Sequence, residues 1–178
     1  GAFFHSVSAR TAGFSTYPMG ELTNAGLFTL TVLMFIGASP GSTGGGIKTT
    51  TFFALMQDVR SVFTKQRPGA FHRTISAESM GKAPVIALLS MLVVCVGTFL
   101  LCILEPECTF IQLLFEEVSA FGTVGLSTGI TPNLCVLSKL IIILTMFTGR
   151  VGAFTLLSIW IDRPEASAHY TEESITIG

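Results

Sequence analysis

The chain has 178 residues, of which 49% are hydrophobic and only 12% are charged. This composition and a mean hydropathy of +0.68 exclude an ordinary soluble domain and are typical of a protein that lies in a lipid bilayer. The net charge of -1 excludes the basic surface with which proteins bind DNA or RNA, so we expect no nucleic-acid partner.

The chain begins with a short helix and a turn that are both repeated later. A helix predicted over residues 3–9 is followed by Thr-Ala-Gly-Phe-Ser-Thr at 11–16. A second short helix, predicted over 109–121, leads into Gly-Thr-Val-Gly-Leu-Ser-Thr at 122–128. A turn that recurs with its flanking helices indicates an architectural repeat.

The next apolar segment, residues 25–56, is long enough to cross a bilayer but is interrupted by Gly-Ala-Ser-Pro-Gly-Ser-Thr-Gly-Gly-Gly at 37–46. Non-helical backbone is tolerated inside a membrane only where it is buried in protein or lines a water-filled cavity. We therefore expect an intramembrane break that faces a cavity, with a static kink as the alternative. A phosphate-binding loop is not expected, because Ile47 separates the last glycine from Lys48.

Two further membrane helices are predicted, outward over residues 83–104 and inward over 134–161. The first is uncharged, the second contains only Lys139 and Arg150 as charged residues, and both exceed the roughly 20 residues needed to span.

Charge placement sets the expected topology. Five basic residues lie in or next to the connection 61–82, which the positive-inside rule places in the cytoplasm: Arg60, Lys65, Arg67, Arg73 and Lys82. By alternation, both repeated turns then lie on the outer side and the tail 162–178 is cytoplasmic.

The repeated turns are interpreted as re-entrant pore loops that bind a cation. A short helix that enters from outside directs its C-terminal dipole, about half a negative charge, toward the bilayer interior. Gly13 and Gly125 give the backbone the freedom to turn several carbonyls to one side, where they can replace the water around an ion. Simple turns between helices are the alternative. Glu116 and Glu117 are expected either at an outer cation-attracting mouth or on a solvated helix face.

Arg150 is the charged residue that most needs an explanation. Superposing the Met-Phe-x-Gly that ends at Gly37 on the one that ends at Gly149 places Ala38 opposite Arg150. A guanidinium near mid-bilayer costs about 2.5 to 3.5 kcal/mol, so it needs hydrogen-bond acceptors. The hypothesis is that Arg150 donates to free carbonyls of the glycine-rich break and pins it across the pore, below the filter.

Together these motifs make the chain similar to the Trk/Ktr/HKT superfamily of potassium transporters, and most of all to the Ktr-type membrane subunit. The resemblance is carried by residues 11–16, 41–51, 123–129 and 146–152 and by the final Ile-Thr-Ile-Gly. It implies an all-α membrane protein in which four helix–pore loop–helix repeats surround one potassium path in a pseudo-fourfold, channel-like fold. The chain would hold the third repeat (1–60) without its first helix and a complete fourth repeat (83–161), as an N-terminally truncated fragment.

The resemblance also implies roles for single residues. Filter carbonyls that bind potassium are expected at Thr11, Ala12, Gly13, Phe14, Thr123, Val124, Gly125 and Leu126. An intramembrane gate is expected at Ala38, Ser39, Pro40, Gly41, Ser42, Thr43, Gly44, Gly45, Gly46 and Lys48, with Arg150 as its partner. Potassium is the implied transported ion, sodium transport stays open, and no cofactor is expected in this chain.

The implied partners are the lipid bilayer of the cell membrane, a second copy of the membrane subunit, and a cytoplasmic regulatory ring that binds the nucleotide. The main alternative function is a sodium-coupled secondary transporter whose discontinuous helix binds substrate. An intramembrane enzyme is not expected, because Ser39, Ser42 and Thr43 have no His, Asp or Glu at comparable depth.

Overall fold

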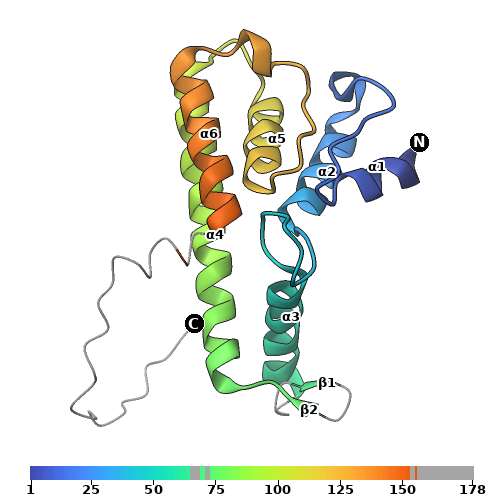
Figure 1. Ribbon diagram of the computed structural model, residues 1–178, viewed down its shortest axis with the longest axis vertical. Helices are drawn as coiled ribbons and strands as arrows, with labels where there is room; N and C mark the ends of the chain where they lie inside the picture. Colours follow the sequence, from blue (N-terminus) through green and yellow to red (C-terminus); the bar gives the residue numbers. More distant parts are fainter. Residues whose placement is uncertain (65–68, 71–72, 153–154, 156–178) are drawn as a thin grey trace, which may run out of the picture.

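The computed structural model describes residues 1–64, 69–70, 73–152 and 155 (Figure 1). Its helices are α1 (Ala2–Ser8), α2 (Asn24–Phe35), α3 (Thr49–Thr64), α4 (Ala77–Leu104), α5 (Phe110–Phe121) and α6 (Val136–Val151), with one-turn 3-10 helices η1 (Met19–Glu21) and η2 (Thr131–Asn133). The only strands in this part of the chain are β1 (Gly69–Ala70) and β2 (Arg73–Thr74), which pair antiparallel between α3 and α4.

Helix α4 runs the length of the structure (Figure 1). Its segment Ser79–Leu104 contains an 18-residue stretch with a mean hydropathy of 2.8 and is the one helix among the described residues that is long and apolar enough to cross a membrane. The helix begins before the predicted residue 83 because the Ser76 hydroxyl accepts a hydrogen bond from the Ser79 N–H at 3.4 Å.

Much of the apolar surface of α4 and α6 faces outward. Leu88 is 71% exposed, Phe99 is 65% exposed and Leu144 is 65% exposed. Exposing large apolar side chains on a helix is unfavourable in water. Such exposure is expected where the helix faces lipid.

Helix α5 lies inside the structure and packs against α2, α4 and α6. Met34, Phe115 and Phe121 are fully buried where α2 meets α5. A methyl group on Gly149 would overlap the Phe121 carbonyl oxygen, so only a glycine fits where α6 meets the end of α5. Small residues allow such close helix packing in membranes.

The break between α2 and α3 is a closed loop. Helical bonding stops at Phe35 and resumes at Thr49. The Gly37 N–H donates to the Ile47 carbonyl at 2.8 Å, and the Ile47 N–H donates to the Phe35 carbonyl at 3.2 Å. These bonds satisfy backbone groups that the helices leave unpaired and hold the two ends of the loop side by side.

The structure describes only part of the last predicted helix. Helix α6 ends at Val151, because Gly152 adopts a φ of +92° that does not continue a helix. Apart from Thr155, the rest of the predicted segment 134–161 and the tail 162–178 lie outside the described residues.

Glu105 joins the end of α4 to the start of α6. One of its carboxylate oxygens accepts hydrogen bonds from the Cys135 N–H at 2.6 Å and the Ser138 hydroxyl at 2.8 Å. These bonds, chiefly that from the Cys135 backbone, hold the pKa of Glu105 below its ordinary value.

The Glu105 contact is therefore expected to make stability depend on pH. Because its pKa is lowered by folding, the contact stabilises the protein above the ordinary glutamate pKa of about 4.3, and this contribution is lost as the pH falls toward the lowered value. Thermal unfolding in detergent between pH 6 and pH 3 should give a smaller acid-induced decrease for Glu105→Gln than for the exposed control Glu107→Gln. Equal decreases would contradict this role.

Candidate functional site

The two repeated turns have the same unusual backbone conformation. Thr11 and Gly13 have φ angles of 67° and 74°, and Thr123 and Gly125 have φ angles of 52° and 92°. Thr11 and Thr123 are the only non-glycine residues with positive φ in the described part of the chain. Such a conformation costs a β-branched residue about 1 to 3 kcal/mol and persists where the surrounding structure enforces it, often at functional sites.

The two turns lie against each other. A methyl group on Gly125 would lie 3.8 Å from the Cα of Gly13, and one on Gly13 would overlap the Val124 carbonyl oxygen. The structure therefore brings together the two Thr-x-Gly turns that sequence analysis predicted as pore loops.

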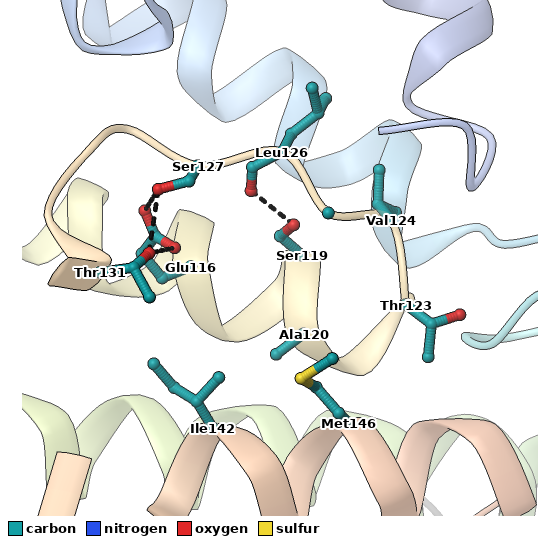
Figure 2. A pocket seen from close by; sticks show the side chains of 11 residues that line it. Glu116, Ser119, Ala120, Thr123, Val124, Leu126, Ser127, Thr131, Ile142 and Met146 are labelled. Atoms are coloured by element: carbon teal, nitrogen blue, oxygen red, sulfur yellow. Dashed lines mark hydrogen bonds between the residues drawn. The ribbon is translucent and has the colours of Figure 1, made fainter. Parts of the chain in front are cut away.

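The eight carbonyls predicted as filter ligands fall into two groups. The Phe14 carbonyl accepts a hydrogen bond from the Ser8 hydroxyl, and the Leu126 carbonyl accepts one from the Ser119 hydroxyl at 2.6 Å (Figure 2). These two oxygens thus bond to the helix behind each turn. Within the described residues, no donor is bonded to the carbonyls of the other six: Thr11, Ala12, Gly13, Thr123, Val124 and Gly125.

The glycine-rich loop passes directly beside both turns. The Gly45 N–H donates to the Thr123 hydroxyl at 2.9 Å. A methyl group on Gly44 would lie 2.8 Å from the Thr11 methyl carbon, so that glycine packs on the first turn. Gly44 and Gly45 are buried, whereas Ser39 to Thr43 form the exposed part of the loop. Only residues without a side chain fit between the loop and the two threonines.

Cationic side chains hold the carbonyls of this loop. The Arg150 guanidinium donates to the Thr43 carbonyl, which is the contact that the sequence analysis expected. The Lys48 amine donates to the carbonyls of Ser42 at 3.1 Å and Gly44 at 2.8 Å.

Arg10 is a further loop contact that the sequence analysis missed. Its guanidinium donates to the carbonyls of Ile36 at 3.1 Å and Gly37 at 3.3 Å, where α2 ends. Its position was visible in the repeat, because Arg10 replaces the Phe-Gly that precedes the second turn. Its partner was not visible, since that contact joins segments from different parts of the fold.

Both expectations for the glutamate pair of α5 are wrong. Glu116 is 5% exposed and Glu117 is fully buried, so neither lies on a solvated face or at an open mouth. The Glu116 carboxylate accepts hydrogen bonds from Ser127 and Thr131 beside a cavity of about 270 Å³ behind the second turn (Figure 2). The Glu117 carboxylate accepts one from Thr145 at 2.6 Å, which links α5 to α6.

The comparison with family models agrees with this architecture. Residues 1–168 match the TrkH model, described as a cation transport protein. The chain belongs to the TrkH family of cation transport proteins. The family resemblance deduced from the motifs is thereby confirmed.

The chain is similar to curated proteins whose names describe potassium uptake. It is 40% identical to the potassium/sodium uptake protein NtpJ of Enterococcus hirae, over 99% of this chain and 41% of that protein. It is 39% identical to the Ktr system potassium uptake protein D of Bacillus subtilis, over 99% of this chain and 40% of that protein. The chain thus spans about two fifths of the length of these TrkH-family relatives.

A solved structure shares the fold. The potassium transporter TrkH from Vibrio parahaemolyticus superposes with a TM-score of 0.70 at 20% identity, over 90% of this chain and 36% of that one. This likeness confirms the predicted all-α membrane-transporter fold.

Substitutions at two glycines with similar φ can distinguish the stability effect of packing in the turn from that of backbone strain. Gly13 and Gly41 have φ angles of 74° and 82°, but only Gly13 lies against other backbone. In the intact protein, Gly41→Ala is expected to cost about 1 to 2 kcal/mol of stability for its positive φ alone. Gly13→Ala should cost clearly more, because its methyl group would overlap the Val124 carbonyl oxygen. Thermal unfolding in detergent measures both, and equal losses would show that the two turns are not in contact.

Proposed function

We propose that this chain contributes two of the pore loops through which an intact potassium uptake protein conducts potassium across the cell membrane. The observation that carries the proposal is the contact between two Thr-x-Gly turns with matching positive φ angles, from segments more than a hundred residues apart. The names of NtpJ and of the Ktr protein support it, since both are described as potassium uptake proteins.

The carbonyls of these turns supply the chemistry. An ion that leaves water loses its hydration shell, and backbone oxygens can replace that shell without any fixed charge. Six carbonyls of the two turns have no donor among the described residues and are proposed as ligands, whereas those of Phe14 and Leu126 are proposed as anchors. Helix α5 ends at the second turn, so its C-terminal dipole adds a negative potential there.

Two loops leave the ion open on its other sides, so the remaining ligands must come from outside this chain. We propose that two equivalent loops in the rest of the intact protein complete a pseudo-fourfold filter. The chain's length, about two fifths of its relatives, is compatible with two of four repeats.

The glycine-rich loop is proposed as the gate. Its buried glycines lie against the first residue of each turn, so in its present position it stands next to the ion path. Arg150 and Lys48 bond to the loop carbonyls, and Arg10 bonds to carbonyls at its base. Opening would require at least the bond from Arg150 to Thr43 to change.

This function involves no covalent chemistry and no cofactor in the chain. The proposed setting is a homodimer in the cell membrane with a separate cytoplasmic ring that binds nucleotide, and with the connection 61–82 and the C-terminal tail on the cytoplasmic side. A sodium-coupled carrier with substrate at the break is less favoured, because Arg10, Lys48 and Arg150 already bond to carbonyls in or next to the break.

A serine at Gly125 tests the filter. Gly125 has space for a side chain but a φ of +92°, so Gly125→Ser is expected to shift the Val124–Gly125 backbone and its carbonyls. Uptake of potassium, rubidium and sodium by the intact protein in liposomes should then lose its discrimination among cations.

The matched control is Gly129→Ser. Gly129 has nearly the same φ, +93°, but lies beyond the predicted filter residues with no atom within 4 Å of an added Cβ. Its carbonyl is not among the proposed ligands, so Gly129→Ser should keep clearly more of the discrimination than Gly125→Ser. Retained discrimination in Gly125→Ser, or uptake that saturates and does not depend on Gly13 or Gly125, would instead favour the carrier.

A neutral residue at position 150 tests the gate. Arg150→Gln removes the charge that holds the Thr43 carbonyl, so the loop should leave its closed position more often and potassium flux at rest should rise. Lys139→Gln is the control, since Lys139 bonds to the Pro132 carbonyl at the other end of α6. Unchanged resting flux in Arg150→Gln would contradict the gating role.

A further inference from the structure

Each pore helix has a buried polar residue three positions before the serine that bonds to its turn. In α1 this residue is His5, which is 4% exposed, and in α5 it is Glu116, which is 5% exposed. Residues three apart lie on the same face of a helix, so His5 and Ser8, like Glu116 and Ser119, face the same segment.

Both residues accept a hydrogen bond from the backbone of equivalent residues, each at the end of its own copy of the turn. Glu116 accepts from the Thr128 N–H at 2.8 Å, and His5 accepts at its Nε2 from the Thr16 N–H at 3.5 Å. The His5 Nδ1 lies 3.0 Å from the Gly1 carbonyl and donates to it, which leaves Nε2 as the acceptor.

The spacing shows that the two pairs are equivalent. The bond from Ser8 to Phe14 spans 6 residues and that from Ser119 to Leu126 spans 7. The bond between His5 and Thr16 spans 11 residues, and that between Glu116 and Thr128 spans 12. Both spans are longer by one in the second copy, as expected from the single residue by which the copies differ.

We propose that His5 and Glu116 are positioning residues, which fix the segment after each pore loop to its helix and thereby set which cations the loop accepts. This inference rests on the proposed potassium function. The serine fixes the carbonyl next to the Thr-x-Gly turn, and His5 or Glu116 fixes a second point two residues later. With both points held, the free carbonyls cannot shift to fit a smaller ion without breaking a buried hydrogen bond.

The two positioning residues differ in how strongly they hold the segment. The Glu116 carboxylate also accepts from the hydroxyls of Ser127 at 2.7 Å, Thr128 at 3.0 Å and Thr131 at 2.8 Å. His5 has its single long bond to the segment and the ring of Tyr17, with centroids 4.4 Å apart. Hydrogen bonds to a charged group are the stronger kind. Loss of Glu116 should therefore have the larger effect.

The test is the ratio of rubidium to sodium uptake by the intact protein in liposomes. Glu116→Ala is expected to lower this ratio about tenfold, since a lost hydrogen bond to a buried charged group is worth about that factor. His5→Ala should lower it less. Glu116→Gln and His5→Gln keep an acceptor at each position and should retain most of the ratio. The exposed Glu107→Ala is the control and should match the unmodified protein.

Uptake is normalised to correctly folded protein by size-exclusion chromatography, which separates a loss of folding from a loss of discrimination. A normal ratio in folded Glu116→Ala, or an equal loss in the alanine and glutamine variants, would overturn the positioning role. Failure of the unmodified protein to take up rubidium would instead overturn the proposed function itself.

Discussion

The structure depends on one constraint: backbone N–H and C=O groups at membrane depth have no water to bond to and must find partners within the protein. The chain leaves helical geometry at its two Thr-x-Gly turns and at the glycine-rich loop. Each time, the lost helical bonds are replaced by specific donors and acceptors, including the Gly37 to Ile47 bond, the Ser8 and Ser119 hydroxyls and the side chain of Arg10. In the two turns, six carbonyls stay without a donor among the described residues: those of Thr11, Ala12, Gly13, Thr123, Val124 and Gly125.

The same constraint ties the turns to the loop. Thr123 is held at a positive φ, and its hydroxyl accepts the Gly45 N–H of the loop. Thr11, in the equivalent position, packs on Gly44. A movement of the loop would therefore alter contacts of both strained residues at once. Such a shared contact gives a physical route by which a change at the loop affects the turns.

The pattern in the sequence was sufficient for the family, for the positions of the two turns and for the contact between Arg150 and the loop. Each follows from a feature that the sequence shows directly: an apolar run, a repeated Thr-x-Gly or a charged residue within an apolar segment. The surroundings of Glu116 and Glu117 differed from those expected, and the contact of Arg10 was not foreseen. Their hydrogen-bond partners come from other segments or, for Glu116, from the return of the chain after its turn.

By itself, the sequence determined that the chain belongs in a membrane as helices and that a Thr-x-Gly turn occurs twice, because hydropathy and internal repetition can be read directly from the order of the residues. Only the tertiary structure decided which carbonyls of those turns are free. The Phe14 and Leu126 oxygens bond to serines of the preceding helices, and Gly13 lies against the Val124 carbonyl from the other turn. The direction of a carbonyl depends on the φ and ψ angles that packing imposes, and residue identity alone does not specify them.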